Sequence, residues 1–365
     1  MARSIAPLLL HIYSSFSIGG AQVRFAAIAN RYPGRWRHAI VAMDGDLSCR
    51  ERFASDVQVE YPEIPMLKGD TIGNIRGFRR VLRALRPHAL VTSNWGSIEW
   101  AMANAAGLRP LVRHVHTEDG FGPDERSAQL PRRVWTRRIV LRRSLVVVPS
   151  HVLLGIAKGS WRLPRVRYIA NGIDLARFDA PDAPVARAEP VVGTVAGLRG
   201  EKNVARLVRA FARIAPEVPG RLAVIGDGPE LGALRDLAES LGITSRVEFA
   251  GHVPAPQGRY KDFDLFALSS DTEQMPLSVL EAMATGLAVA ATDVGDIRGM
   301  LAPANAPFLT TRDDAALAEA MRALLLQPAL CREIGAANRA KARRDYDQEA
   351  MFSAYAAIFD GDAAG

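Results

Sequence analysis

The chain has 365 residues, of which 48% are hydrophobic and 23% are charged. This length exceeds what one ordinary hydrophobic core serves, so we expect two domains, and apolar residues that recur throughout exclude a largely disordered chain. The two cysteines, Cys49 and Cys331, lie far apart in the sequence, which argues against a disulfide framework or a zinc site and suits a reducing compartment. The net charge of +7 favours an anionic partner, such as nucleotide phosphates, nucleic acid or a lipid surface.

The N-terminal segment, residues 1–16, combines one arginine with a short apolar run, as a weak signal peptide would. The run soon turns polar and leads into a glycine pair, so we interpret it as a buried first strand. No apolar stretch approaches the ~18 to 20 residues of a membrane span. We therefore expect a cytoplasmic protein.

Short apolar runs alternate with helical patterns along both halves of the chain. The first half predicts strands at 7–13, 38–43, 88–93, 110–116, 144–150 and 165–170, with helices at 21–32, 74–86 and 97–106. The second half predicts strands at 190–196, 221–226, 246–251, 264–269 and 287–292, with helices at 203–215, 229–241 and 277–285 and only helices after residue 312.

Continuous runs of Val, Ile, Leu and Ala indicate strands that are covered on both faces, and strand–helix alternation makes them parallel. We therefore predict an α/β protein with two doubly wound, Rossmann-like domains. The domains are placed at 1–180 and 181–346, joined at the proline-containing segment 178–190, and a C-terminal helix and tail at 347–365 could return to the first domain. Ligands bind at the carboxyl ends of parallel strands, so a cleft between the domains is the expected site.

Three loops have the composition of an anion site. Gly19 and Gly20 separate a strand from a helix, whose N-terminus offers free N–H groups, although a simple turn would look the same. VGTVAGLRGEKN (192–203) brings Arg199 and Lys202 before a helix, and VIGDGPE (224–230) contains Gly226 in another strand-to-helix turn.

The fourth loop is DTEQMPLSVLE at 271–281. Pro276 suits the first turn of a helix, and the N–H groups of Met275, Leu277 and Ser278 are offered to an anion there. Glu273 precedes the helix and Glu281 lies inside it. A carboxylate accepts two hydrogen bonds from a vicinal diol, so two carboxylates suit the two sugars of a nucleotide-sugar, while helix capping by Glu273 is the alternative.

Together these motifs resemble the retaining glycosyltransferases of family 4, which have the GT-B fold and include many bacterial exopolysaccharide and lipopolysaccharide sugar transferases. The resemblance covers nearly the whole chain. It rests on GGA (19–21), ANGID (170–174) with Phe178, GTVAGLRGEKN, VIGDGPE and above all the E-x7-E motif followed by AMATGLAVAATDVGD (282–296).

The resemblance implies a role for each matching residue. Glu281 would bind the ribose hydroxyls of the nucleotide, and Glu273 would hold the transferred sugar. Lys202 would neutralise the diphosphate with backbone N–H groups at Gly20 and at 275–278. His116, at the end of a strand, would lie beside the donor sugar, and we place His114 on the opposite face of that strand, as a core residue or a support for the site.

This chain departs from the family pattern at three positions. Gly197 stands where an arginine usually follows the position of Ala196; either Arg199 replaces its charge or the site depends on Lys202 alone. Gln274 stands in place of a glycine, and Ala288 in place of the proline of GLPV. The first departure leaves a catalytically weak nucleotide-sugar-binding protein as an alternative.

The resemblance implies transfer with retention to a glycan or lipid-linked acceptor, with no cofactor and no metal. We assign no metal to the D-x-D pairs at Asp44/Asp46, Asp262/Asp264 and Asp360/Asp362. An oxidoreductase that uses NAD or FAD is a second alternative, but the glycine pattern is not GxGxxG. Nucleic-acid binding has only the positive charge behind it, so we predict none.

The segment PRRVWTRRIVLRRS (131–144) could bind anionic headgroups on the inner face of the plasma membrane. The candidates for membrane or acceptor contact are Arg132, Arg133, Trp135, Arg137 and Arg138. On a helix these arginines spread around most of the circumference, so part of the set must serve another purpose, such as pairing with Asp124 and Glu125. A solvated basic helix is the alternative.

Overall fold

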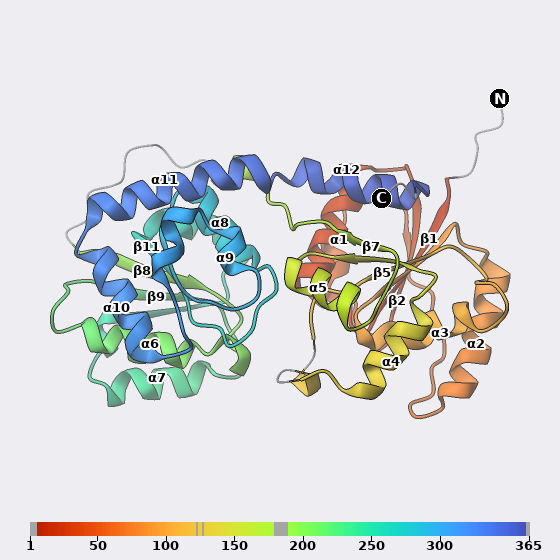
Figure 1. Ribbon diagram of the computed structural model, residues 1–365, viewed down its shortest axis with the longest axis horizontal. Helices are drawn as coiled ribbons and strands as arrows, with labels where there is room; N and C mark the ends of the chain where they lie inside the picture. Colours follow the sequence, from red (N-terminus) through yellow and green to blue (C-terminus); the bar gives the residue numbers. More distant parts are fainter. Residues whose placement is uncertain (1–5, 122, 126–127, 179–188, 363–365) are drawn as a thin grey trace. The chain divides into compact units, whose positions relative to one another are not determined.

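The computed structural model describes residues 6–121, 123–125, 128–178 and 189–362, and the chain divides into two compact units (Figure 1). Unit 1 comprises residues 1–170 and 351–365, and unit 2 comprises residues 171–350. The division after Ala170 lies ten residues before the predicted boundary at 180. Most of the predicted linker, residues 179–188, lies outside the described residues.

Unit 1 is built on one parallel sheet with the strand order β3-β2-β1-β4-β5-β6-β7. The strands are β1 (Leu8–Tyr13), β2 (Arg37–Ala42), β3 (Val59–Glu60), β4 (Ala89–Ser93), β5 (His114–Thr117), β6 (Leu145–Val148) and β7 (Val166–Tyr168). The order reverses between β1 and β4, which is where ligands bind in doubly wound sheets.

Helices cover both faces of this sheet. They are α1 (Gly20–Arg31), α2 (Thr71–Leu85), α3 (Ile98–Ala105), α4 (Pro131–Val140), α5 (His151–Gly159) and α12 (Gln348–Asp360). Apolar residues of α12, among them Phe352 and Phe359, share a buried cluster with Ile28 of α1 and with β1 and β4 (Figure 1). On the other face, Phe78 of α2 stacks on Trp100 of α3. The C-terminal helix is therefore part of the core of unit 1.

Unit 2 repeats this architecture with the strand order β10-β9-β8-β11-β12-β13. The strands are β8 (Val191–Val195), β9 (Arg221–Ile225), β10 (Val247–Gly251), β11 (Leu265–Leu268), β12 (Val289–Thr292) and β13 (Leu309–Thr310). The helices are α6 (Val204–Ile214), α7 (Leu231–Ser240), α8 (Leu277–Thr285), α9 (Ile297–Met300), α10 (Asp314–Leu325) and α11 (Pro328–Asp345). The order reverses between β8 and β11.

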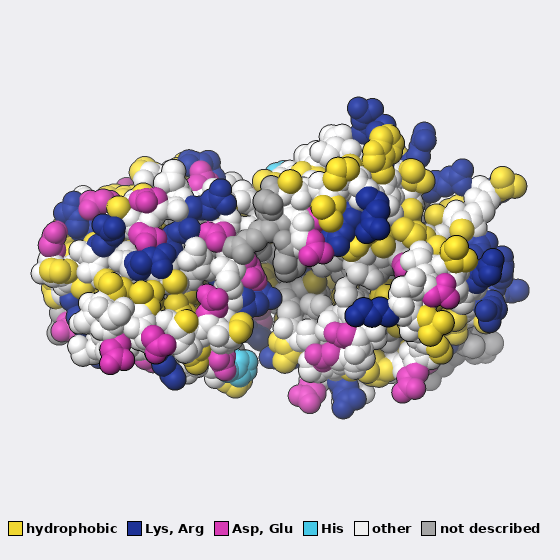
Figure 2. All heavy atoms as spheres, turned by 90° about the horizontal axis from the view of Figure 1, so that it is seen from below, with side chains coloured by type: hydrophobic (Ala, Val, Ile, Leu, Met, Phe, Trp, Pro, Cys, Tyr) yellow, Lys and Arg dark blue, Asp and Glu magenta, His cyan; other side chains and the backbone are white. Residues whose placement is uncertain are grey.

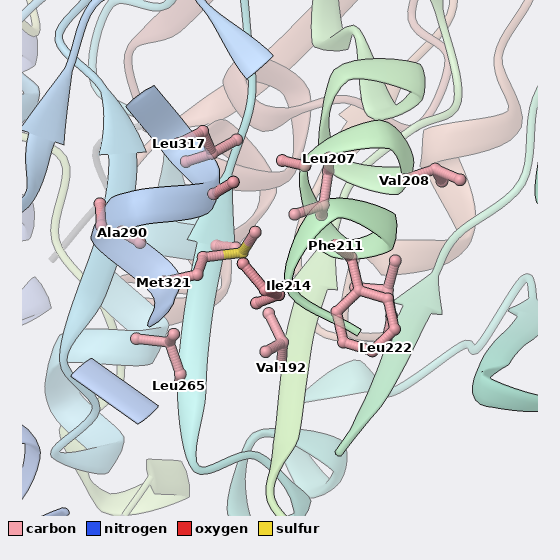
Figure 3. Packing of buried hydrophobic residues seen from close by; sticks show 14 of the residues in the cluster. Val192, Leu207, Val208, Phe211, Ile214, Leu222, Leu265, Ala290, Leu317 and Met321 are labelled. Atoms are coloured by element: carbon pink, nitrogen blue, oxygen red, sulfur yellow. The ribbon is translucent and has the colours of Figure 1, made fainter. Parts of the chain in front are cut away.

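The core of unit 2 forms because α6 and α10 bury their apolar faces on the sheet. Figure 3 shows Leu207 and Phe211 of α6 with Met321 of α10, packed over Val192 and Leu265 of the central strands. Each fully buried side chain of this kind contributes about 1.5–3 kcal/mol to folding. This packing fixes the loops at the carboxyl ends of β8 and β11, where the predicted site residues lie.

The surface gives two further observations. On the face of unit 2 that Figure 2 shows, Lys and Arg side chains lie interspersed with Asp and Glu, without a continuous basic stripe. Within the part of the chain that the structure describes, no helix combines the length and the apolar character that crossing a membrane requires.

Candidate functional site

The two loops at the sheet reversals contain the predicted glycine and lysine positions. In unit 1, Gly19 is the extended residue before α1 and Gly20 is its first residue. The first turn of α1 has no acidic residue, so nothing in that turn opposes an anion at the helix N-terminus, and the anion site stays a prediction. In unit 2, the corresponding loop runs from Ala196 to Asn203.

Lys202 is positioned by the start of α6. Asn203 adopts a left-handed conformation (φ 42°), and its side chain accepts a hydrogen bond from the N–H of Arg206, which caps the helix. Lys202 Nζ then lies 2.6 Å from Glu273 Oε1, and Ser270 Oγ donates to the same oxygen at 2.7 Å. The side chains of Lys202 and Glu273 are 19% and 7% exposed. Two residues that the resemblance assigns to different parts of the donor thus form one ion pair.

A second set of charges, which sequence reasoning missed, ties the same two loops together. Arg206 Nη2 lies 2.8 Å from Asp271 Oδ1, and Arg206 Nη1 donates to the carbonyl of Ser269 at 2.7 Å. Asn203 Nδ2 donates to the carboxylate of Asp271. These contacts hold the loop after β11 against α6 and so fix Glu273 beside Lys202.

Helix α8 begins directly after Pro276. Pro276 is the capping residue and Leu277 the first helical residue, so the N–H groups of Leu277 and Ser278 lie in the first turn. Met275 lies outside the helix: its side chain is buried, and its carbonyl accepts from Asn171 Nδ2 at 2.9 Å. The predicted anion site therefore retains Leu277 and Ser278, but Met275 is not part of the helix end.

Glu281 lies one turn inside α8 and has a partner that the sequence did not indicate. Tyr260 Oη donates to Glu281 Oε2 at 2.5 Å, from the 3₁₀ helix η7 (Pro256–Asp262). Burial raises the pKa of Glu281 to about 7, and the Tyr260 hydrogen bond opposes this rise. Glu281 is therefore a half-buried carboxylate that changes its charge near neutral pH.

The two remaining loop predictions of unit 2 have different outcomes. Arg199 is 61% exposed and pairs with Glu201, and a Cβ added at Gly197 would lie 3.8 Å from Arg199 Nε, which is ordinary van der Waals contact. Gly197 can therefore accept a Cβ without a clash, and Arg199 lies beside that position. Gly226 has φ 141°, a Cβ there would lie 1.9 Å from the carbonyl oxygen of Ala196, and its N–H donates to Gly251. Gly226 thus allows two loops to pack, and its N–H is not offered to a ligand.

In unit 1, His116 is fully buried. Its Nδ1 lies 2.7 Å from Thr92 Oγ1, and its Nε2 lies 3.6 Å from Glu118 Oε2. Thr92 Oγ1 also lies 2.8 Å from His114 Nε2. Placing His114 on the opposite face was wrong, because residues two apart in a strand share a face. Burial lowers the pKa of His114 to about 3.

Arg137 is not a surface residue, which corrects its assignment as a membrane or acceptor contact. It is 1% exposed, and its guanidinium reaches Glu118 and Glu125 at 3.1 Å each. It also lies over the rings of Trp95 and Trp161. A charge so enclosed needs these partners, because an unpaired buried cation is costly.

The other arginines of α4 divide between the inside and the outside of unit 1. Arg133 is 13% exposed and pairs with Asp124 and Glu125, the partners considered in the sequence. Trp135 and Ile139 are 58% and 69% exposed, and Arg138 lies over the Trp135 ring at 5.0 Å. Arg132 is exposed as well. Arg132, Trp135, Arg138 and Ile139 therefore form one outward face, which we call the α4 face.

Among the described residues, no three or more His, Cys, Asp or Glu side chains gather in a way that could hold a metal ion. The charged groups of the unit 2 site are one lysine and two glutamates, flanked by a helix N-terminus. Such a set suits an anion bonded to polyhydroxylated groups, because the cation and the N–H groups bind phosphate and the carboxylates bind hydroxyls.

Two doubly wound parallel sheets with helices on their faces, one in each unit, are the architecture of the GT-B class of α/β proteins. The GT-B structure of the Anabaena protein HepE, in complex with UDP and glucose, superimposes with a TM-score of 0.78 at 19% identity, covering 97% of this chain and 99% of that chain. Residues 18–177 match the model of the family described as "Glycosyltransferase Family 4", and residues 178–341 match "Glycosyl transferases group 1". The chain belongs to family 4 of the glycosyltransferases.

Two curated relatives are similar over part of their length. An N-acetyl-α-D-glucosaminyl L-malate synthase from Bacillus anthracis is 30% identical over 48% of this chain and 46% of its own. A GDP-mannose-dependent α-mannosyltransferase from Mycolicibacterium smegmatis is 29% identical over 66% of this chain and 64% of its own. The chain thus spans about half to just under two thirds of these relatives.

Proposed function

We propose that this protein transfers a sugar, with retention of configuration, from a nucleotide-diphosphate sugar to a hydroxyl of a glycan or lipid-linked acceptor in cell-surface polysaccharide synthesis. The observation that carries the proposal is the Lys202–Glu273 ion pair in the loop that leads into α8, together with Glu281 one turn inside that helix. It supplies one cation, one set of N–H groups and two carboxylates, which is what a diphosphate between two sugars requires.

Each residue has a distinct proposed role. Glu281 accepts hydrogen bonds from the ribose diol, and Lys202 with the N–H groups of Leu277 and Ser278 binds the diphosphate. Glu273 leaves Lys202 to accept hydroxyls of the transferred sugar. On unit 1, the anion site at Gly19 and Gly20 stays a prediction. So does a role for His116 beside the sugar, although its burial means that another residue must move or that it acts through a neighbour.

The chemistry follows from where charge develops. The bond from the anomeric carbon to the phosphate oxygen breaks, and the acceptor oxygen bonds the same carbon from the same face. The acceptor proton passes to the departing phosphate. Negative charge grows on the leaving diphosphate, so Lys202 and the α8 N-terminus stabilise the transition state more than the ground state. We expect these groups to suffice without a resident metal or cofactor.

The nucleotide and the sugar are open to direct test. Relatives are named for GDP-mannose and a structural neighbour holds UDP and glucose, so both bases belong in the screen. A ligand that binds only the native state raises its melting temperature. We expect one of the UDP-, GDP- or ADP-linked hexoses to do so, and NMR of the product should show the α-configured donor giving an α-linked sugar. NAD or FAD stabilising the protein instead would contradict the proposal, and binding without hydrolysis or transfer would leave a sugar-nucleotide-binding protein.

We further propose that the α4 face contacts an anionic membrane surface on which a lipid-linked acceptor resides. Support comes from an exposed tryptophan and isoleucine flanked by Arg132 and Arg138 on one side of one helix. Sedimentation with anionic but not neutral vesicles at low salt is expected. Replacing Arg132 and Arg138 with Gln should weaken it, whereas the same charge change at the exposed Arg221 and Arg235 should not. An equal loss of vesicle binding in both double variants would mean that net charge, and not the α4 face, determines the association.

A further inference from the structure

The partner of Glu281 is a buried tyrosine. Tyr260 has no exposed surface, and its ring is held among Phe178, Phe263 and Phe266 at centroid distances of 5.9, 5.8 and 5.9 Å. Its hydroxyl meets Glu281 Oε2 at 2.5 Å. A ring enclosed on several sides has one position, so the hydroxyl is delivered to the carboxylate from a fixed point.

This contact determines both the direction and the charge of the carboxylate. Burial and the neighbouring Glu281 raise the pKa of Tyr260 well above its ordinary value, so the hydroxyl stays protonated and acts as donor. A donor on Oε2 favours the ionised carboxylate and holds Oε1 in a defined orientation. An ionised carboxylate with one oxygen occupied still has lone pairs for a vicinal diol.

We propose that Tyr260 is a positioning residue for nucleotide recognition, which holds the Glu281 carboxylate ionised and oriented toward the ribose hydroxyls of the donor. The inference rests on the proposed function, because it deepens the role given there to Glu281. Tyr260 does not contact the ribose in this account; it acts through Glu281.

Other charged groups near this pair have partners of their own. On η7, Arg259 pairs with Glu248 and Asp262. On the 3₁₀ helix η4 (Leu175–Phe178), Arg177 pairs with Asp174. On α11, the side chain of Arg339 lies near the end of α8, since a Cβ built at the capping residue Gly286 would stand 3.6 Å from Arg339 Cδ. Burial and Tyr260 are the two causes that shift the pKa of Glu281, so the tyrosine is the group to change.

The pH dependence gives a readout that a merely structural tyrosine would not move. An ionised Glu281 accepts from both hydroxyls of a diol and does so more strongly than the protonated acid, so affinity should fall as the pH drops below the pKa of about 7. Losing the Tyr260 donor raises that pKa further. The Tyr260→Phe variant should therefore lose most affinity at low pH and recover toward the wild type at high pH.

The experiment is calorimetric titration of UDP, GDP and ADP into the full-length protein between pH 6 and 9. Three proteins are compared: wild type, Tyr260→Phe and the control Tyr346→Phe. Tyr346 is a buried tyrosine of the same unit, and its hydroxyl donates to the carbonyl of Met300. Protonation of the nucleotide's own phosphate affects binding to all three proteins equally, so it cancels when the affinity of each variant is divided by that of the wild type at the same pH.

With the best of the three nucleotides, we expect Tyr260→Phe to bind about tenfold more weakly than wild type at pH 6.5, with a smaller deficit at pH 9. Tyr346→Phe should follow the wild type. A Tyr260→Phe variant that matches wild type at every pH overturns the role of Tyr260, and one constant deficit at every pH overturns its effect on the charge of Glu281. Either result leaves the proposed function standing. If the wild type binds none of the three nucleotides, the proposed function fails and the inference fails with it.

Discussion

Lys202 and Glu273, separated by 71 residues in the sequence, form an ion pair with Nζ and Oε1 2.6 Å apart. The pair joins the loop before α6 to the loop before α8. A bound diphosphate would offer Lys202 a second, more highly charged partner, and Glu273 would then be available for sugar hydroxyls. The ion pair therefore couples the two ends of the proposed donor through one contact.

Replacing Glu273 with Gln should separate binding from turnover. The change removes the competing carboxylate, so affinity for a nucleoside diphosphate should stay equal or increase up to about tenfold, since charge-assisted contacts are the strong ones. Turnover with the full sugar donor should fall, because the amide of Gln keeps only one accepting oxygen and no charge for the hydroxyls of the sugar. Calorimetry with the diphosphate and a coupled assay for its release measure the two quantities. Parallel losses in both would contradict separate roles.

Gly197 and Arg199 test whether the missing arginine is replaced. A Cβ at Gly197 has open space, so Gly197→Arg should fold normally and tighten diphosphate binding by about 1 kcal/mol, with Arg199→Ala weakening it by a similar amount. Melting temperature checks the fold and calorimetry the affinity. If Arg199→Ala leaves the diphosphate affinity unchanged while Gly197→Arg increases it, then no residue of this chain replaces the positive charge of the missing arginine.

Arg137 should be important for stability and unimportant for membrane contact. Arg137→Ala leaves Glu118 and Glu125 without their buried partner, and we expect unfolding free energy to fall by about 3–5 kcal/mol. All five tryptophans of the chain lie in unit 1, so their fluorescence in urea reports on that unit alone. The neighbouring change Arg138→Ala should cost less than about 0.5 kcal/mol. An equal loss of unfolding free energy in Arg137→Ala and Arg138→Ala would mean that the buried ion pairs do not stabilise unit 1 more than an exposed arginine does.

Acid should destabilise unit 1 before the carboxylates titrate. Burial lowers the pKa of His38 to about 4 and that of His114 to about 3, from an ordinary value of 6.5. The unfolded chain therefore binds more protons below pH 6.5, and stability that is complete above this pH is lost as the pH falls toward 4. Each histidine contributes a slope of at most about 1.4 kcal/mol per pH unit. Urea midpoints from tryptophan fluorescence at pH 7.5, 6 and 5 measure this loss of stability. A urea midpoint that does not change with pH would contradict the prediction that the buried histidines are neutral.

The sequence predicted most of the fold because its strands are continuous apolar runs. The runs at 190–196 and 264–269, for example, become β8 (Val191–Val195) and β11 (Leu265–Leu268). The edge strands β3 and β13 have two residues each, too few for any periodic pattern. The predicted strand at 110–116 starts only at His114, because Asn104 holds the segment before it through the backbone of Val112.

The motifs located the site loops, but they could not indicate which side chains pair. Tyr260 lies 21 residues before Glu281, in a 3₁₀ segment with no motif of its own. Arg137 looked like its neighbours because six arginines stand within 131–144, and only the positions of Glu118 and Glu125 turn it inward. Such partners depend on tertiary packing, which no local pattern encodes.

The central claim is that unit 2 binds a nucleotide diphosphate through Glu281 at the ribose and Lys202 at the phosphates. The direct measurement is calorimetry of a nucleoside diphosphate and its parent nucleoside with wild type, Glu281→Ala and Lys202→Ala. We predict that Glu281→Ala weakens both ligands by about 1–3 kcal/mol, because ribose hydroxyls lose their acceptor. Lys202→Ala should weaken the diphosphate alone. Wild-type affinity in both variants, for every nucleotide tested, would contradict the account.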